Sequence, residues 1–354
     1  MKQRLITIAQ QFAGDQPILA INPLGNGLIN DTYQVSCANT EFVLQRINHQ
    51  VFNNPEAVMA NLQQLQQHLA KLNSHTIKLK LPATLLNQQQ TSLYQDPQQQ
   101  FWRALELISP SESREQLSND QEAAQVGFAL GHFHRLCSEL PINQLHDTLP
   151  GFHITPSYFA SYQSLCQQVS LDIDCAQQHA CHRFIANHTD QIQVLEQAKQ
   201  QGELKQRVIH GDPKLNNFLF TPGSDQIISL IDLDTVKPGL VHYDIGDCLR
   251  SCCHRSAGNQ FDLPRCEIIL KSYLNEAGHF FSEADYHYLY PAIWLIPFEL
   301  GLRFFSDYLN GNRYFKTSYA KQNLDRASAQ FELCLSIQDQ QTEIKQLIQQ
   351  LRTN

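Results

Sequence analysis

The chain has 354 residues and 42% of them are hydrophobic, which suits a folded protein with a substantial core and room for two lobes. Its net charge is −8 and it has no dense run of lysine and arginine, so neither a nucleic-acid backbone nor an anionic membrane is expected as its main partner. The composition also excludes the disordered and collagen-like classes.

The N-terminus and the cysteines favour a cytoplasmic protein. Residues 1–6 do not begin a signal peptide, and no window approaches the roughly 18 uninterrupted apolar residues of a membrane span. The ten cysteines show no CxxC spacing, which favours free thiols in a reducing compartment. At Cys248, Cys252, Cys253 and His254, buried thiols are the favoured interpretation and a zinc site is the alternative.

The N-terminal part of the chain predicts a helix over residues 1–13, followed by a β-hairpin made of residues 24–35 and 41–47. Gly25 and Gly27 lie in the turn that opens the first of these strands. Because glycine lets a backbone approach a ligand closely, we expect this turn to lie against phosphate groups. An ordinary hairpin tip is the alternative.

Arg46 ends the second strand and is the candidate cation for nucleotide phosphates, at a place where kinases usually have lysine. The alternative is a solvent-facing strand cation. The next helix is predicted at residues 55–72, and Glu56 is its only acid. Glu56 would either brace the phosphate-binding cation or complement the helix dipole.

Two further strands are predicted at residues 76–80 and 84–86, before an apolar run at residues 101–108. That run is a candidate hinge between two lobes, because a Ser-Pro pair ends it. Backbone groups at Glu106 and Ile108 could then hold an adenine edge. An ordinary core strand is the alternative.

The second half of the chain is mainly helical in its periodicity. His132 and His134 lie in a helix that follows a capping-box pattern at residues 119–122, and both are interpreted as structural. A long connection at residues 141–158 holds His153, a candidate for lining a substrate pocket together with Phe152 and Tyr158. Further helical patterns are found at residues 157–201, 266–274, 284–290, 292–309 and from 321 onward.

The central stretch Val208-Ile-His-Gly-Asp-Pro-Lys-Leu-Asn-Asn217 has the spacing of a kinase catalytic loop. An apolar strand runs into His-x-Asp, and an asparagine follows after four intervening residues. Asp212 would accept the proton of a substrate hydroxyl, Asn217 would bind a metal ion, and His210 would orient the loop through hydrogen bonds. Turn-capping by Asp and Asn is the structural alternative, but it does not explain all the matched positions.

A second acid reaches the same place through a hairpin. Residues 218–220 and 226–232 are predicted to pair, in a register that puts Asp232 opposite about residue 214. Asp232 and Asn217 would then offer hard oxygen ligands to Mg²⁺, which accompanies ATP in phosphoryl transfer.

Asp244 lies in the next predicted helix start, Tyr243-Asp-Ile-Gly-Asp247. It would brace the catalytic loop, and N-terminal capping of that helix is the alternative. The segment before it is short and lacks an Ala-Pro-Glu ending, so it does not match a protein-kinase activation loop.

With these motifs in place, the chain resembles the aminoglycoside-phosphotransferase-like small-molecule kinases. More narrowly, it is similar to the N-acetylhexosamine 1-kinases over nearly its whole length. The strings that carry this similarity are Gly25-Asn-Gly-x-Ile-Asn-Asp-Thr-Tyr33, Val43-Leu-Gln-Arg-Ile-Asn48, Val51-Phe-x-Asn-Pro-Glu-Ala-Val-Met59, Lys214-Leu-Asn-Asn217, Ile231-Asp-Leu-Asp-Thr-Val-x-Pro-Gly239, Tyr243-Asp-x-Gly-Asp247 and Arg303-Phe-x-x-Asp-Tyr-Leu-x-Gly311.

The resemblance implies an α+β, protein-kinase-like fold with two lobes. Residues 1–108 would form a β-rich nucleotide-binding lobe that includes the hinge, and residues 109–354 a larger helical lobe with the catalytic loop. The implied reaction transfers the γ-phosphoryl group of ATP, with Mg²⁺, to the anomeric hydroxyl of GlcNAc or GalNAc. The expected partner is thus a small sugar, and the oligomeric state is left open.

The resemblance also suggests a sugar pocket, to which Asp212, Asp234, Arg303, Asp307 and Tyr308 could supply polar contacts and an aromatic wall. Arg303 could instead pair with Asp307 one helical turn away. The chain departs from common kinases in having arginine at position 46 and no clear bracing glutamate.

Two other interpretations stay open. The same fold could phosphorylate another small alcohol, such as homoserine, choline or an aminoglycoside. The chain could also be an inactive nucleotide-binding scaffold, although the intact Asp212, Asn217 and Asp232 argue against that.

Overall fold

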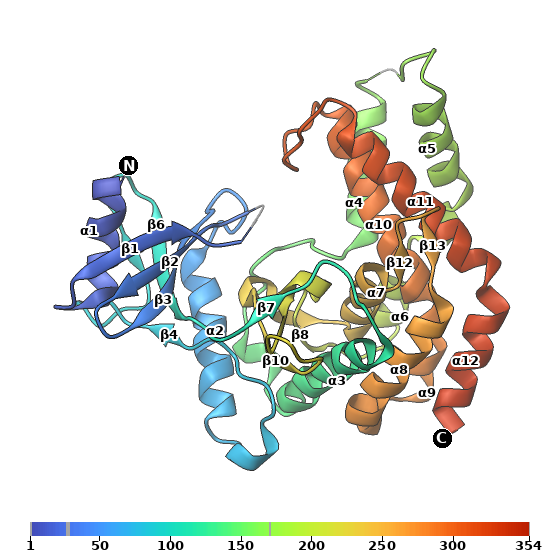
Figure 1. Cartoon of the computed structure of the whole chain (residues 1–354). Coiled ribbons are helices and arrows are strands. Elements are labelled where there is room, and N and C mark those ends of the chain that lie inside the picture. Colours follow the sequence, from blue (N-terminus) through green and yellow to red (C-terminus); the bar gives the residue numbers. More distant parts are fainter. Residues whose placement is uncertain (1, 26–28, 170, 354) are drawn as a thin grey trace.

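A computed structural model describes residues 2–25, 29–169 and 171–353 of the chain. A mainly antiparallel sheet with one helix on its outer face lies at one end of the molecule, and a larger group of helices forms the other end (Figure 1). The predicted two-lobe, kinase-like α+β architecture is confirmed. We call these parts the sheet lobe and the helical lobe.

The sheet lobe has the strand order β1-β2-β3-β6-β4, and β5 pairs with β6. All of these neighbours are antiparallel. Its elements are α1 (Lys2–Ala13), β1 (Ile18–Pro23), β2 (Asp31–Cys37), β3 (Glu41–Ile47), β4 (Thr84–Leu85), β5 (Tyr94–Gln95) and β6 (Phe101–Glu106).

One face of this sheet packs on α1. Phe42 and Leu44 of β3 are buried there with Ile8 and Phe12 of the helix and Trp102 of β6. Side chains alternate between the two faces of a strand. Val43, Gln45 and Ile47 of β3 therefore point to the opposite face, toward the helical lobe.

Helix α2 (Pro55–Leu69) connects the two lobes. The side chain of Asn54 caps it by accepting a hydrogen bond from the Ala57 amide at 3.0 Å. Val58 and Leu62 are buried in the core of the helical lobe rather than under the sheet, and the helix contacts α3. Motions of α2 are thus tied to the larger core.

The strand predicted at residues 76–80 is wrong. Residues Ser74–Thr76 form a 3₁₀ turn, η1, and Lys80 makes only an isolated bridge with Ser229. The cause is that this segment finds its partners in the helical lobe: the amide of Lys78 donates to His132 Nε2 at 3.0 Å, and that of Lys80 to the Ile228 carbonyl at 2.8 Å.

The helical lobe is built around the long apolar helix α10, which packs against α11, α7 and α4. Within the described ranges, no helix is long and apolar enough to cross a membrane. The helices of the helical lobe are α3 (Asp120–Cys137), α4 (Thr155–Cys166), α5 (Ala176–Asn187), α6 (Val194–Gln200), α7 (Val241–Cys252), α8 (Leu263–Ala277), α9 (Glu283–His287), α10 (Leu289–Leu309), α11 (Gln322–Asp339) and α12 (Gln341–Thr353).

Short strands in this lobe carry the central motif. They are β7 (Glu112–Ser113), β8 (Arg207–Ile209), β9 (Phe218–Phe220), β10 (Ile227–Leu230), β11 (Lys237–Gly239), β12 (His254–Arg255) and β13 (Gln260–Phe261). Strand β8 pairs with β11, β12 pairs with β13, and β9 lies between β10 and β7.

The predicted hairpin exists as β9 and β10, but its register differs from the prediction. An irregularity between Ile227 and Ser229 shifts the pairing, and the ladder continues with the Ile231 amide donating to the Asn217 carbonyl at 2.9 Å. Asp232 therefore follows directly beside Asn217 instead of opposite residue 214. This shift brings the second acid closer to the asparagine.

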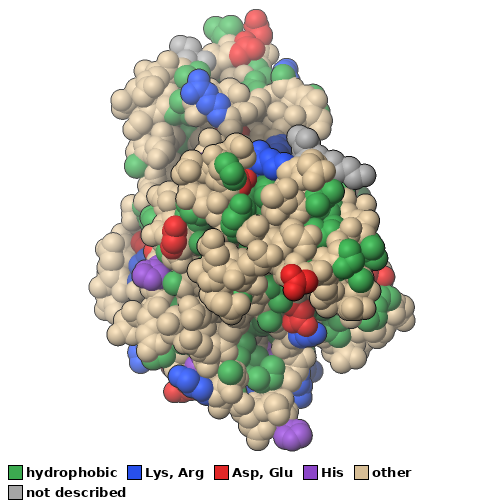
Figure 2. Space-filling view, turned by 90° about the vertical axis from the view of Figure 1, so that its left-hand side faces the viewer, with side chains coloured by type: hydrophobic (Ala, Val, Ile, Leu, Met, Phe, Trp, Pro, Cys, Tyr) green, Lys and Arg blue, Asp and Glu red, His purple; other side chains and the backbone are tan. Residues whose placement is uncertain are grey.

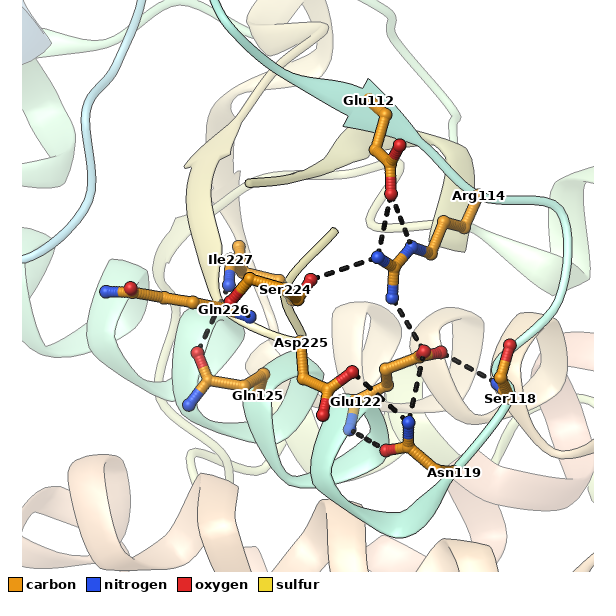
Figure 3. Close-up of polar contacts among 10 residues, drawn as sticks. All are labelled: Glu112, Arg114, Ser118, Asn119, Glu122, Gln125, Ser224, Asp225, Gln226 and Ile227. Carbon is orange, nitrogen blue, oxygen red and sulfur yellow. Dashed lines mark hydrogen bonds and ion pairs between the residues drawn. The ribbon is translucent and has the colours of Figure 1, made fainter. Parts of the chain in front are cut away.

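Arg114 binds the β9–β10 hairpin from the crossing segment, residues 107–119, which runs from β6 to α3 (Figure 3). Its guanidinium binds Glu112 at 2.8 Å, Glu122 of α3 at 2.6 Å and the carbonyl of Ser224, in the hairpin turn, at 3.0 Å. It also lies 4.2 Å from the ring centroid of Phe220. The crossing segment, α3 and the hairpin thus share one cation.

The surface of the sheet lobe carries few charged side chains. Seen from that end, the molecule shows lysine, arginine, acidic and hydrophobic side chains scattered among uncharged polar side chains and backbone (Figure 2). The glutamines at residues 88–90 and 98–99 of this lobe are exposed and add uncharged polar groups to its surface.

Replacing Arg114 should destabilise the fold. In Arg114→Met, the carboxylate of Glu122, only 3% exposed, loses its cation, and we expect unfolding to become easier by about 3 kcal/mol. Glu112→Gln is the matched control, because the Glu112 side chain is 43% exposed and its pair with Arg114 is worth less than about 1 kcal/mol. Equal denaturation midpoints for both variants would contradict the assignment.

Candidate active site

One buried carboxylate holds the catalytic loop. Asp244, in the first turn of α7, is fully buried. Its Oδ2 accepts the His210 amide at 2.7 Å, and its Oδ1 accepts the Gly211 amide at 2.9 Å. The sequence prediction that Asp244 braces the loop is confirmed by these two bonds.

His134 completes this brace from α3. Its Nε2 donates to Asp244 Oδ2 at 2.9 Å, and its Nδ1 contacts the Tyr273 hydroxyl at 2.8 Å. Burial alone would raise the pKa of Asp244, but the hydrogen bond and charge of His134 hold that pKa below its usual value. His134 is thus structural, as predicted, and the structure it supports is the catalytic loop.

His210 links the catalytic loop to the strand that leads to Asp232. Its Nε2 donates to the Ile231 carbonyl at 2.9 Å, and its Nδ1 accepts the amide of Asp212 at 3.2 Å. Burial lowers the pKa of His210 and so favours the neutral ring that this pattern requires. The geometry assigns His210 an orienting role.

Gly211 is required by the shape of the loop. Its φ of +88° is in the left-handed region, and a Cβ atom there would lie 2.6 Å from the Thr235 carbonyl oxygen. Thr235 also donates its hydroxyl to the His210 carbonyl at 2.8 Å. The catalytic loop and the turn after Asp232 are therefore in direct contact.

Asp212 is partly open to the space between the lobes and pairs with Lys214. The Lys214 ammonium lies 2.5 Å from Asp212 Oδ2, and Asn217 donates its side-chain amide to the Asp212 carbonyl at 2.7 Å. Burial opposes the charge of Lys214, but Asp212 and Asp232 together raise the pKa of Lys214. Lys214 is thus a fixed positive charge between two acids, a role that sequence reasoning did not assign.

Asp232 has the backbone of a residue under constraint. Its φ and ψ of 64° and 55° are left-handed, and η5 (Leu233–Thr235) begins directly after it. Desolvation, followed by the charge of Asp234, raises the pKa of Asp232 to about 6 against the opposing effect of Lys214. Its side chain is nevertheless exposed toward solvent, so this acid sits where an added cation would be stabilised.

Asn217 and Asp232 together fit a divalent metal ion of the Mg²⁺ type. Asn217 uses its amide nitrogen on Asp212, which turns its amide oxygen the other way. That oxygen and the Asp232 carboxylate are hard ligands, and Mg²⁺ needs few of these because it keeps waters and phosphate oxygens. In the part of the chain that the structure describes, no group of three or more His, Cys, Asp or Glu side chains forms a metal site. The cysteines at 248, 252 and 253 are buried free thiols.

Arg46 does not face this centre. Its guanidinium pairs with Asp31 and lies 2.9 Å from Gln100 Oε1. By strand alternation it is on the same face of β3 as Phe42 and Leu44, which pack on α1. Arg103 of β6 is the cation on the opposite face, where it binds Gln45 and Asp234.

Glu56 is exposed and forms no ion pair with any described residue, so a brace from the start of α2 is not formed. Gly25 has a positive φ of +69° in the turn before β2, while Gly27 lies outside the described residues. Gly25 therefore has the left-handed backbone conformation that glycine favours.

The end of β6 and the crossing segment present specific backbone groups. The Glu106 amide donates to the Ala83 carbonyl at 2.8 Å, and its carboxylate pairs with Lys80 at 2.6 Å. The Ile108 carbonyl accepts the Ser111 hydroxyl at 2.6 Å. Among the described residues, the Ile108 amide has no hydrogen-bond partner.

Arg303 of α10 lies among four aromatic rings. Its guanidinium carbon is 5.1 Å from the ring centroid of Phe152, 5.0 Å from Tyr158, 5.9 Å from Tyr314 and 5.6 Å from Phe315. It forms no ion pair with any residue that the structure describes. Burial works against its charge, but the charges of Tyr158, Glu299, Tyr314 and Asp212 raise the pKa of Arg303.

His153 reaches the catalytic loop from the long connection before α4. Its Nε2 donates to the Gly211 carbonyl at 2.8 Å, and its Nδ1 contacts Glu299 of α10 at 3.2 Å. Thr155 donates its hydroxyl to the same carboxylate at 2.7 Å. Burial lowers the pKa of His153, but the hydrogen bond and charge of Glu299, together with the charge of Asp247 and the bond to Gly211, outweigh that effect and the net shift is upward. His153 therefore positions the loop, whereas its neighbour Phe152 contacts Arg303.

Asp307 and Tyr308 do not point into the same space as Arg303. Asp307 accepts the backbone amides of Arg313 and Tyr314 at 2.9 and 2.8 Å, and that of Phe315 at 2.9 Å. Tyr308 receives a hydrogen bond from Gln178 of α5 at 2.9 Å. Asp307 thus shapes the loop that brings two aromatic rings to Arg303, and it does not pair with Arg303.

The fold and this site define a small-molecule phosphotransferase of the kinase-like type. The chain belongs to the family described as "Phosphotransferase enzyme family", whose model matches residues 20–267.

Solved structures share the fold at low identity. An amicoumacin kinase is 15% identical with a TM-score of 0.64, covering 96% of this chain and 93% of that one. A microcompartment-associated aminopropanol kinase is 16% identical with a TM-score of 0.61, covering 96% and 98%. An ethanolamine kinase of Plasmodium vivax is 13% identical with a TM-score of 0.58, covering 93% and 86%.

Proposed function

We propose that this protein transfers the γ-phosphoryl group of ATP to the anomeric hydroxyl of an N-acetylhexosamine, either GlcNAc or GalNAc. The observation that carries the choice of acceptor is Arg303, a cation surrounded by four aromatic rings and without a carboxylate partner among the described residues. The sequence strings shared with the N-acetylhexosamine 1-kinases support the same choice.

The donor would be a nucleotide with Mg²⁺. The amicoumacin kinase structure contains AMP-PNP and Ca²⁺, and here Asn217 and Asp232 supply the ligands that such a metal needs. Bound Mg²⁺ would neutralise charge on the phosphate groups. The turn with Gly25 and Gly27 would cover these phosphates, and the Glu106 carbonyl and Ile108 amide would hold the adenine edge.

Asp212 would act as the general base. Its Oδ2 is held by Lys214 at 2.5 Å, so Oδ1 is the oxygen left to accept the proton of the acceptor hydroxyl. An anomeric hydroxyl is more acidic than an ordinary alcohol, which makes a carboxylate base sufficient. Lys214 stays charged beside Asp212 and can balance negative charge as the phosphoryl group moves.

The acceptor side favours a neutral sugar over an amine. A cationic acceptor would be repelled by Arg303, whereas an N-acetyl carbonyl or a sugar hydroxyl can accept its hydrogen bonds. The rings of Phe152, Tyr158, Tyr314 and Phe315 offer the apolar wall on which a sugar face packs. Asp307 supports that wall through the loop amides it binds.

A panel of acceptors tests the proposal. We expect ADP release with GlcNAc or GalNAc in the presence of ATP and Mg²⁺, little release with homoserine, choline or aminoglycosides, and a sugar 1-phosphate by phosphorus NMR. Asp212→Asn is the control, because an amide cannot accept the proton; it should be inactive and still bind nucleotide. A 6-phosphate product, or preference for an amine acceptor, would overturn the proposal.

Arg303→Met should separate acceptor binding from donor binding. Loss of a charged hydrogen-bond donor is worth about 2–3 kcal/mol, so the KM for the sugar should rise on the order of 30-fold while the KM for ATP stays near the wild-type value. Lys345→Met is the matched control, since it removes a cation of α12 that lies over the ring of Tyr290, in the first turn of α10. An unchanged sugar KM in Arg303→Met would remove this residue from the acceptor pocket.

A further inference from the structure

An ion pair is buried between the two lobes. Arg103 of β6 and Asp234 of η5 are each about 1% exposed, and Arg103 Nη2 lies 2.5 Å from Asp234 Oδ1. Burying two charges is costly unless they are paired and further hydrogen-bonded. The surroundings of both groups supply such bonds.

Asp234 is engaged by the sheet lobe on both of its oxygens. Asn30, directly before β2, donates its side-chain amide to Asp234 Oδ2 at 2.8 Å and accepts the Asn48 amide at 3.0 Å. Gln45 of β3 holds Arg103 by accepting its Nε at 3.0 Å and its Nη2 at 2.8 Å. Both carboxylate oxygens of Asp234 thus face groups of the sheet lobe, and at about 1% exposure the side chain is closed to an acceptor sugar.

The helical lobe holds the same segment from the other side. Thr148 donates its hydroxyl to the Asp234 carbonyl at 2.7 Å, and Asn61 of α2 donates to the Val236 carbonyl at 2.8 Å. Asp232, the metal-binding candidate, is two residues away in the same turn. Asn30, the sheet and Asp232 are thus connected through Asp234.

We propose that Arg103 and Asp234 are positioning residues for the nucleotide and its metal ion. They hold Asn30, directly before β2, and Asp232 in a fixed arrangement. In kinases a lysine on β3 binds the phosphates and pairs with a glutamate on the adjacent helix. In this chain Gln45 faces the cleft on β3, and Arg103 with Asp234 makes the connection. The inference rests on the proposed nucleotide and metal donor, but not on the identity of the acceptor.

A double-mutant cycle distinguishes positioning from a purely structural role. Arg103→Met leaves an unpaired carboxylate and Asp234→Asn an unpaired guanidinium, whereas the double variant leaves no buried charge. Each single variant should lower the unfolding temperature on the order of 5 °C, and the double variant should recover part of that loss. Positioning is not recovered, because the connection through Asp234 to Asn30 and Arg103 is still altered.

The functional part of the experiment measures the binding of AMP-PNP with Mg²⁺, so that no acceptor is needed. We expect all three variants to bind it about 10-fold to 100-fold more weakly than the wild type, the range found when groups that orient metal ligands are removed. The sugar KM of the variants should stay within about twofold of wild type. Arg4→Met is the control, because it breaks an ion pair with the buried Asp96 on the outer side of the sheet and should leave nucleotide affinity unchanged.

Three outcomes overturn the inference. Nucleotide affinity that returns in the double variant along with stability would make the pair merely structural. A raised sugar KM with unchanged nucleotide affinity would place Asp234 in the acceptor pocket, as the sequence resemblance suggested. A wild-type protein that binds no AMP-PNP with Mg²⁺ would defeat the proposed donor itself, and this inference with it.

Discussion

The buried carboxylate of Asp244 is the constraint on which the rest of the site depends. It accepts the amides of His210 and Gly211 and the imidazole of His134, so three donors from two distant segments converge on one side chain. A carboxylate with this many donors stays ionised although it is buried. The catalytic loop is therefore held at its start, and the Asp212 side chain projects from a fixed backbone.

Other supports act on the same short loop from different directions. His153 donates a hydrogen bond to the Gly211 carbonyl, and Thr235 donates one to the His210 carbonyl. The His210 ring donates to the Ile231 carbonyl, directly before Asp232. Arg114 fixes the hairpin that delivers Asn217 and Asp232. Such convergence suits phosphoryl transfer, which needs exact positions and charge neutralisation more than covalent chemistry.

The parts of this site that sequence could predict are local in the chain. The catalytic loop and its hairpin lie within about 25 residues, so spacing and turn signals are enough to bring Asp212, Asn217 and Asp232 together. The orientation of Arg46 could also have been predicted. Arg46 follows Phe42 and Leu44 at intervals of two residues, so all three side chains lie on the same face of β3, the face that packs on α1. Arg103, a charged residue with the apolar neighbours Trp102 and Ala104 in β6, was the signal for the inward cation.

The remaining roles depend on contacts that no local pattern encodes. Asp307 was expected beside the sugar, but it binds three amides of a loop whose conformation is set by tertiary packing. Asp234 was expected there as well, but its partners are 131 and 204 residues away, at Arg103 and Asn30. The strand expected at residues 76–80 failed for a related reason, since its backbone partners are in the other lobe.

The most direct test of this account is the turnover of Asp244→Asn. An asparagine keeps one acceptor oxygen but turns an NH₂ group toward donors, so the loop loses at least one of its anchoring bonds. The account predicts a kcat lower by about 100-fold or more, with nucleotide affinity and secondary structure close to wild type. A kcat within about twofold of wild type would show that the catalytic loop does not depend on this carboxylate.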